Sequence, residues 1–213
     1  DVVFPITHGT FGEDGTLQGL LELADLPYVG PGVLGSALAM DKEMTKRVLR
    51  DAGVPVVDFL VQRRGELNAT AIIEQLGLPA FVKPANLGSS VGINKAKTPE
   101  SLAVALAEAA RYDTKVLAER AVIGREFECS VLGNEVMRAS YPCEIVPERE
   151  FYDYEAKYVL DTTRIELPAQ LSTEQTEEVR RLAIAAVRAL DCEGMARVDF
   201  LMETATGAFY VNE

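Results

Sequence analysis

The last two predicted strands, Met195-Ala-Arg-Val-Asp-Phe-Leu-Met202 and Ala208-Phe-Tyr-Val-Asn-Glu213, carry the strongest signal for the fold and its site. Arg197 and Asp199 share one face of the first strand, because alternate residues of a strand point the same way. A tight hairpin would place Asp199 opposite Glu213. Two facing carboxylates repel unless a cation lies between them, so this pair predicts a site for a hard metal ion such as Mg²⁺. The alternative is a solvated sheet face on which Arg197 balances Asp199.

A second stretch, Lys83-Pro-Ala-Asn-Leu-Gly-Ser-Ser-Val-Gly92, joins two predicted strands through small residues. Its glycines and hydroxyls let backbone N–H groups approach a phosphate, and Lys83 adds a fixed positive charge. The element predicted to follow is a strand, so this is not the phosphate loop that connects a strand to a helix. A glycine-rich hairpin with one exposed lysine is the alternative.

The stretch Phe151-Tyr-Asp-Tyr-Glu-Ala-Lys-Tyr158 carries four aromatic side chains without a helical or strand period. It is typical of a loop that folds over a ligand, and a loop packed on its own aromatics is the alternative. His8 is the single histidine of the sequence and lies beside glycines at the end of the first predicted strand. It is a candidate site residue, or a packed or solvated side chain.

The remaining pattern predicts a mixed α+β chain in two layered lobes. Residues 1–6 read as a buried strand, and residues 26–32 as a break at a domain junction. Further strands are predicted over residues 56–61, 80–84, 91–95, 116–119, 126–131 and 136–141. Helices are predicted after residue 15 (with Leu17, Leu20, Leu21 and Ala24 inward), from about 41 to 53, and over 68–77, 98–110 and 172–190. Asn68, Thr98 and Ser172 are the expected helix N-caps.

Composition excludes several classes of protein. The 213 residues are 48% hydrophobic and 25% charged, which is typical of a globular protein. A net charge of −12 argues against a general nucleic-acid binder. No apolar run reaches the ~20 residues that span a bilayer. Three widely spaced cysteines predict neither a zinc site nor a disulfide framework, which favours a reducing cytosol. Both ends read as strands, so we expect a piece of a longer protein.

Taken together, these motifs resemble one family, the D-alanine–D-alanine ligases of the ATP-grasp superfamily. The resemblance rests on His8-Gly, Gly12-Glu-Asp-Gly15, Asp41-Lys42, Val82-Lys83-Pro, Gly88-Ser-Ser90, Glu119, Glu126, the stretch 151–158, Arg197-Val-Asp199 and Asn212-Glu213. It implies an ATP-grasp fold, with two α+β lobes clamping ATP after the end of an α/β N-terminal domain. The implied divisions are residues 1–30, 31–122 and 123–213.

The resemblance also implies a role for each matched residue. ATP would be bound by Lys42, Lys83, Gly88, Ser89, Ser90, Glu119, Glu126, Phe151 and Lys157. Asp199 and Glu213 would hold two Mg²⁺ (or Mn²⁺) ions. The catalytic group would comprise Arg197 at the oxyanion, His8 near the first D-alanine, Ser89 and Tyr158 near the second, and Lys157 at the terminal phosphates.

The implied reaction joins two D-alanines through a D-alanyl phosphate, with ATP converted to ADP, for peptidoglycan precursor synthesis. Tyr158 favours an amine as second substrate over D-lactate, and D-serine is a further alternative. Family members are commonly cytoplasmic homodimers that bind neither nucleic acid nor membranes. A family glutamate before the first residue and an asparagine after the last lie outside this sequence. A nucleotide-binding fragment without ligase activity is therefore one alternative. An ATP-grasp enzyme that joins other substrates is another, which the stretch around Tyr158 disfavours.

Overall fold

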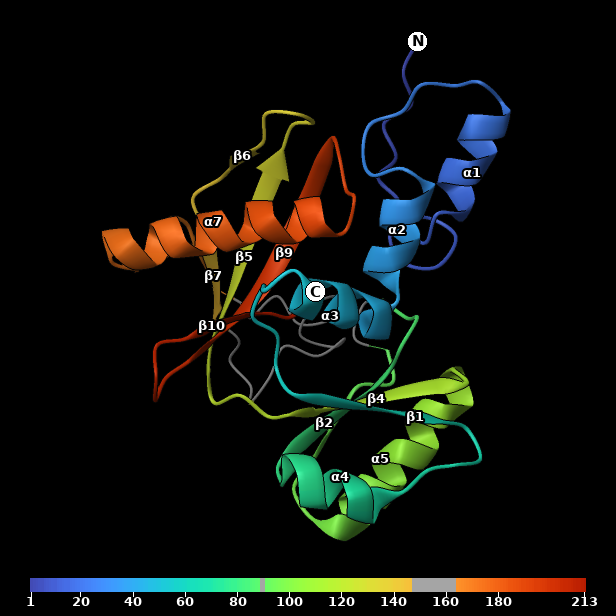
Figure 1. Cartoon of the computed structure of the whole chain (residues 1–213), viewed down its shortest axis with the longest axis vertical. Helices are drawn as coiled ribbons and strands as arrows, with labels where there is room; N and C mark the ends of the chain where they lie inside the picture. Colours follow the sequence, from blue (N-terminus) through green and yellow to red (C-terminus); the bar gives the residue numbers. More distant parts are fainter. Residues whose placement is uncertain (89–90, 147–163) are drawn as a thin grey trace.

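The computed structural model describes residues 1–88, 91–146 and 164–213, which form two antiparallel sheets with helices packed against them (Figure 1). The helices are α1 (Thr16–Leu23), α2 (Val33–Met40), α3 (Lys42–Asp51), α4 (Ala69–Leu76), α5 (Pro99–Tyr112) and α7 (Thr173–Ala189). The strands are β1 (Phe59–Arg63), β2 (Ala80–Pro84), β3 (Asn94–Ala96), β4 (Lys115–Arg120), β5 (Gly124–Leu132), β6 (Arg138–Ala139), β7 (Cys143–Val146), β8 (Arg164–Glu166), β9 (Met195–Glu203) and β10 (Phe209–Val211). The predicted α+β class is confirmed.

The first sheet has the order β1-β4-β2-β3 and separates an apolar face from a charged one. Ala80 and Val82 point toward α4 and α5 and are fully buried in a core with residues of both helices. Phe81 and Lys83 alternate with them and point to the opposite face. Phe81 is paired with Glu119 of β4, which puts the Glu119 carboxylate on that same face. The sheet therefore presents charged side chains away from its own core.

Helix starts in this lobe follow the predicted caps. The Asn68 side chain accepts a hydrogen bond from the N–H of Ala71 and begins α4. Thr98 and Ser101 form a reciprocal capping box at the start of α5, with Pro99 in the first turn. Each such cap contributes about 1 kcal/mol to stability. These caps fix where the helices begin and hence how they cover the sheet.

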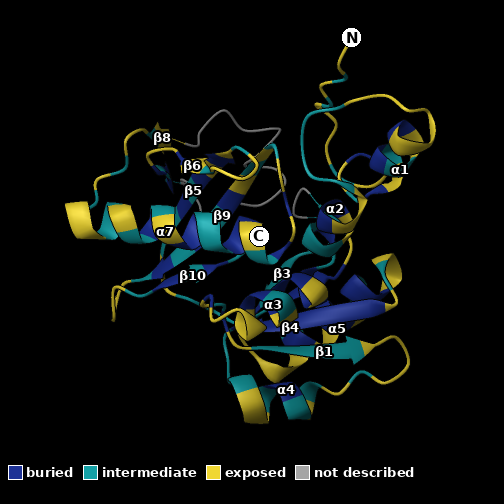
Figure 2. Cartoon of the chain, turned by 45° about the horizontal axis from the view of Figure 1, so that its top comes forward, coloured by how far each residue is buried: buried dark blue, intermediate teal, exposed yellow. Residues whose placement is uncertain are grey.

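The second sheet has the order β10-β9-β5-β7-β8, with β6 paired to β5. Phe127, Cys129 and Val131 alternate on the buried face of β5, as their period of two predicts. The inner face of α7 packs on them, and its outer side is exposed (Figure 2). The buried α7 residues are the predicted Val179, Leu182, Ala183, Ala186 and Val187. The capping box of Ser172 and Gln175 that starts this helix is also confirmed.

The N-terminal segment differs from its prediction. Residues 1–6 do not form a buried strand: Val2 and Ile6 are 64% and 77% exposed, and only Val3 forms an isolated bridge, with Tyr28. The apolar run there predicts a buried strand, but apart from the Val3 bridge it pairs with no described strand. In α1, Leu21 is buried, whereas Leu20 is 62% exposed. Ala24 is also exposed, so the predicted inner face was wrong at these two positions.

Helix α2 was not predicted, because its residues lack the contrast between polar and apolar faces that marks an amphipathic helix. Its Gly35 has a packing reason: a Cβ there would lie 2.6 Å from the carbonyl oxygen of Asp191, after α7. The strand predicted over 91–95 begins only at Asn94, because Gly92 turns the chain with φ of +72°. The strand predicted over 136–141 is reduced to β6.

Helix α3 links the two lobes. Leu49 and Val54 belong to the core beneath the second sheet. Just after α3, the N–H of Val211 donates to the carbonyl of Pro55 at 2.8 Å. The N-terminal turn of α3, by contrast, contacts the first sheet, since the N–H of Lys42 donates to the Ala85 carbonyl at 3.0 Å. The boundaries 30/31 and 122/123 stay predictions. Across the described residues, no helix has the length and apolar character that crossing a membrane requires.

Candidate functional site

A cavity of about 380 Å³ lies between the charged face of the first sheet and the second sheet. Its walls combine aromatic, aliphatic and charged side chains from both lobes. They include Lys42, Phe81, Lys83, Ile93, Lys95, Glu119, Arg120, Val122, Ile123, Gly124, Glu126, Phe127, Glu128, Ile145, Asp199, Phe200, Leu201, Asn212 and Glu213. A cavity of this size with a few convergent charges is the usual form of a small-ligand site.

One part of the cavity is apolar. Phe81 comes from β2, whereas Ile145 and Leu201 come from β7 and β9 of the facing sheet. Glu126 on β5 pairs with both Ile145 and Leu201 in the sheet register, and so lies between them. Apolar walls with a carboxylate beside them suit a planar ring that carries a hydroxylated group.

On the side of the first sheet, the cavity wall also contains a buried group of charged side chains. Glu119 is 2% exposed, and one of its oxygens lies 2.6 Å from Nζ of Lys83. Its second oxygen lies 2.8 Å from Nζ of Lys46, which is 1% exposed and comes from α3. Burial alone would raise the pKa of Glu119, but Lys46 and Lys83 outweigh burial and hold that pKa at about 2. The carboxylate is therefore ionised throughout the physiological range.

Two residues after β10 reach across to the lysines of the other lobe. Nζ of Lys42 lies 2.9 Å from Oε1 of Glu213 and donates to the carbonyl of Leu87 at 2.7 Å. Nζ of Lys83 donates to Oδ1 of Asn212 at 3.1 Å. The two lysines and Glu213 thus converge on one end of the cavity, beside the chain that leads into Gly88.

Acidic side chains gather on the facing sheet. Glu128 on β5 is paired with Asp199 on β9, and the N–H of Asp199 donates to the Glu213 carbonyl at 2.8 Å. This confirms the predicted proximity of Asp199 and Glu213. Arg197 forms two hydrogen bonds to the Asp199 carboxylate, at 2.6 and 2.7 Å, and lies 3.5 Å from Glu128. The ion pair between Arg197 and Asp199, which the alternative interpretation predicts, is therefore also present.

The pKa of Asp199 is raised to about 6. Burial is the main cause; Arg197 opposes it, and the carboxylates of Glu128 and Glu213 raise the pKa further. The two hydrogen bonds from Arg197 therefore offset only part of the effect of burial on Asp199. Carboxylate oxygens are the ligands that Mg²⁺ prefers, so the chemistry of Asp199 and Glu213 fits a divalent cation. Among the described residues, no three acidic, histidine or cysteine side chains are grouped to hold a metal ion.

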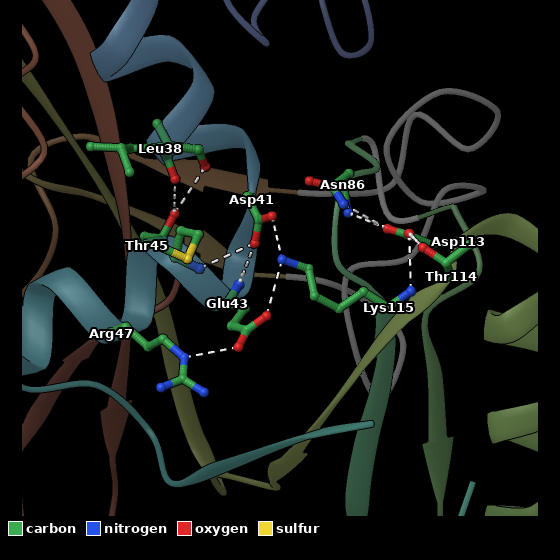
Figure 3. Close-up of polar contacts among 11 residues, drawn as sticks. Leu38, Asp41, Glu43, Thr45, Arg47, Asn86, Asp113, Thr114 and Lys115 are labelled. Carbon is green, nitrogen blue, oxygen red and sulfur yellow. Dashed lines mark hydrogen bonds and ion pairs between the residues drawn. The ribbon is translucent and has the colours of Figure 1, made fainter. Parts of the chain in front are cut away.

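A second network ties α3 to the first sheet (Figure 3). The buried ammonium of Lys115 contacts the Asp41 carboxylate and lies 3.0 Å from Oε2 of Glu43. Asp41 is also the N-cap of α3, accepting from the N–H groups of Glu43 and Met44. This network fixes the turn of α3 that begins with Lys42.

The same strand end holds the loop that leads to Gly88. The Asp113 carboxylate accepts hydrogen bonds from the backbone and side-chain N–H groups of Asn86, both at 2.9 Å, and from the N–H of Lys115 at 3.1 Å (Figure 3). Burial raises the pKa of Asp113, but these hydrogen bonds outweigh it and lower the pKa below its usual value. The turn of α3 that carries Lys42 and the loop that leads to Gly88 are therefore both bonded to the start of β4.

The structure brings most of the predicted site residues that it describes to this cavity. Lys42, Lys83, Glu119, Glu126, Asp199 and Glu213 line it, and Gly88 follows Leu87, which contacts Lys42. Arg197 contacts the lining residue Asp199. The side chain of His8 is exposed. Its neighbour Gly9 lies close to the loop, because a Cβ added to Gly88 would lie 3.4 Å from Cα of Gly9. Ser89, Ser90, Phe151, Lys157 and Tyr158 lie outside the described residues.

Sequence reasoning missed several charged residues at the site. Lys95, Arg120 and Glu128 line the cavity, and Lys46 and Lys115 support it from behind. Alternation along β5 indicated that Glu128 shares a face with Glu126. Nothing in the sequence indicated that the two lysines would be buried, because each lies in a segment with ordinary surface composition.

The cavity between the two sheets has Lys42, Lys83 and Glu119 on one wall and Glu126, Glu128 and Asp199 on the other, and the fold is that of an ATP-grasp protein. Solved structures agree. A D-alanine-D-alanine ligase from Coxiella burnetii superposes with a TM-score of 0.87 at 40% identity, covering 100% of this chain and 57% of the other. The VanG D-Ala:D-Ser ligase from Enterococcus faecalis has a TM-score of 0.89 at 37% identity, with 100% and 62% covered.

The chain belongs to the D-alanine–D-alanine ligase family. The family model described as "D-ala D-ala ligase C-terminus" matches residues 48–213, and that of the "D-ala D-ala ligase N-terminus" matches residues 1–31. A D-alanine–D-alanine ligase of Solibacter usitatus is 59% identical over the whole chain, which spans 66% of that relative. One of Thermoanaerobacter sp. (strain X514) is also 59% identical, with 61% of it covered. The chain thus spans about two thirds or less of the length of these relatives.

Proposed function

We propose that the protein joins two D-alanines to D-alanyl-D-alanine with ATP, through a D-alanyl phosphate. The observation that carries this proposal is one cavity in which Lys42 and Lys83 face the carboxylates of Asp199 and Glu213. Cations that hold phosphates and carboxylates that hold metal ions are the parts that phosphoryl transfer requires. Family membership supplies the substrates.

In this proposal the nucleotide spans the cavity from its apolar part to its charged end. The adenine lies between Phe81 and the facing Ile145 and Leu201, near Glu119 and the backbone beyond it. Glu126 binds the ribose. The phosphates lie at the charged end, where the N–H groups around Gly88 and the Lys42 and Lys83 ammoniums converge. Ser89, Ser90, Phe151 and Lys157 are assigned to ATP by family resemblance.

The acidic group would hold Mg²⁺ or Mn²⁺, two ions per site, with Asp199 and Glu213 as protein ligands. When bound, such ions offset the charge of the terminal phosphates. The remaining roles in the proposed reaction belong to side chains of the protein. Arg197, which contacts Asp199 and Glu128, would stabilise the oxyanion formed when the second amino group attacks. His8, Ser89, Tyr158 and Lys157 keep their proposed roles near the two amino acids and the terminal phosphate.

The cellular setting is part of the same proposal. D-alanyl-D-alanine would serve peptidoglycan synthesis, in the cytoplasm, and the complete protein would be a homodimer as its relatives commonly are. A specific observation keeps a second candidate: a structural neighbour of TM-score 0.89 is named a D-Ala:D-Ser ligase. D-serine is therefore the alternative second substrate.

The test compares this chain with a chimera in which the remaining segments of the Solibacter usitatus relative flank it. Phosphate release from ATP is measured with Mg²⁺ and D-alanine, and the dipeptide product is identified by mass. We expect D-alanine to stimulate the chimera, whereas the 213-residue chain responds weakly or not at all. Stimulation only when D-serine is added would favour the alternative. If neither amino acid stimulates a chimera that binds ATP, the ligase proposal is wrong.

A further inference from the structure

Lys46 lies one turn along α3 from Lys42, and the proposed function gives it no role. It is among the largest fully buried side chains of the described residues. Isolated ammonium groups are strongly disfavoured in the interior. Burial lowers the pKa of Lys46, and attraction to Glu119 does not fully offset this effect. Burial deprives the Lys46 ammonium group of its hydration, so its position calls for a functional or structural explanation.

Its neighbourhood contains more positive than negative charge. The Glu119 carboxylate lies between Nζ of Lys46 at 2.8 Å and Nζ of Lys83 at 2.6 Å. From β1, the residue paired with Glu119 is the apolar Phe59. From beyond β10, Asn212 accepts a hydrogen bond from Lys83, and Glu213 attracts Lys46 from its contact with Lys42. One carboxylate therefore serves two buried ammonium groups.

A bound nucleotide changes this balance. Lys83 lines the cavity, and in the proposed function it turns toward the phosphates. Each step toward a phosphate oxygen weakens its contact with Glu119. A fully buried carboxylate that loses its cation takes up a proton, and documented pKa values for such groups reach about 8–9. Glu119 stays ionised in the complex only if a second cation remains beside it.

We propose that Lys46 is a positioning residue that keeps Glu119 ionised and fixed in the cavity wall while Lys83 engages the nucleotide phosphates. This inference rests on the proposed function in that it requires ATP in the cavity. It assigns Lys46 no contact with the substrate. The residue acts through Glu119, and through Glu119 on the position of Lys83.

The arrangement separates this role from a purely structural one. Without ligand, Lys83 lies 2.6 Å from Glu119 and would still compensate its charge if Lys46 were replaced, so the fold does not require Lys46. Methionine has a similar length and an apolar end. The cost of breaking a buried ion pair comes from the uncompensated charge that is left behind, and in Lys46→Met the remaining charge, on Glu119, is still compensated by Lys83. Lys46→Met should therefore leave the empty protein at least as stable and weaken ATP binding.

The experiment is calorimetric titration of the chain with ATP and Mg²⁺ at pH 7, in two buffers of different ionisation enthalpy. For Lys46→Met we expect a melting temperature no lower than that of the unsubstituted chain and a Kd about tenfold higher, as for other groups that orient a contact residue. We also expect uptake of about one extra proton on binding. Arg188→Met is the control: it removes a charge from an exposed position of α7, outside the cavity lining, and should change none of these.

The double variant Lys46→Met/Glu119→Gln locates the proton. With no carboxylate at position 119, the extra uptake should vanish; if it persists, the proton goes elsewhere and the inference is wrong. It is also wrong if Lys46→Met binds ATP unchanged and without uptake, or melts more than about 4 °C lower. Failure of the unsubstituted chain to bind ATP would instead contradict the proposed function.

Discussion

Replacing Glu119 by glutamine should lower the free energy of unfolding by about 3–5 kcal/mol at pH 7. Glu119 is the shared partner of Lys46 and Lys83, and the substitution leaves two ammonium groups buried without a carboxylate. Urea unfolding followed by circular dichroism measures the change. Glu178→Gln is the control, because Glu178 pairs with Arg181 on the exposed side of α7 and such pairs contribute less than about 1 kcal/mol.

The stability difference caused by Glu119→Gln should also depend on pH in a definite direction. The pKa of Glu119 is about 2 in the folded chain, below its usual 4.5. A lowered carboxylate pKa stabilises the fold above the unfolded value and loses this effect as pH falls through the folded one. The difference between the unsubstituted chain and Glu119→Gln should thus be full above pH 4.5 and shrink toward pH 2. A constant difference, or one below about 1 kcal/mol at pH 7, would contradict the buried ion-pair account.

Replacing Asp199 by asparagine should raise the Mg²⁺ concentration that gives half-maximal ATP binding by about tenfold or more. The carboxylate lies in an acidic group with Glu128 and Glu213, and its removal takes one charged oxygen ligand from the metal. Titrating Mg²⁺ at fixed ATP measures the effect. Asp51→Asn, on an exposed residue at the end of α3, is the control. Unaltered metal dependence would leave Asp199 as no more than the ion-pair partner of Arg197.

Local signals predicted a large part of the fold. The period of two along Phe127, Cys129 and Val131, and the period of α7, follow from burial of one face and are written in the sequence itself. Helix caps at Asn68 and Ser172 are likewise local, because a side chain bonds to a backbone N–H three residues away. These features depend on neighbours along the chain and need no knowledge of tertiary contacts.

The parts that could not be predicted depend on distant contacts. Lys46, Lys83 and Glu119 come from three elements, and no period or spacing shows that they meet in one buried group. Helix α2 is held by close packing of Gly35 on the chain after α7, which a search for amphipathic helices does not detect. The first six residues show the opposite error, since a strand-like pattern forms a strand only where a partner strand is present.

The candidate site was predicted in part, and for a similar reason. Neighbouring strands brought Asp199 and Glu213 together as their hairpin required. Lys42 and Lys83 entered through family resemblance, and the structure then placed both at one end of the cavity. Lys95, Arg120 and Glu128 reach the cavity from sheet faces whose orientation becomes known only once the two sheets are placed opposite each other.

The central claim is that the cavity between the two sheets binds ATP through Lys42 and Lys83, and equilibrium binding tests it most directly. ATP with Mg²⁺ is titrated into the chain and into the double variant Lys42→Met/Lys83→Met, with folding of both checked by circular dichroism. The account predicts one nucleotide per unsubstituted chain and a Kd about 100-fold higher in the variant, because two charged phosphate contacts are lost. Absence of binding to the unsubstituted chain, or equal affinity for the two, would contradict it.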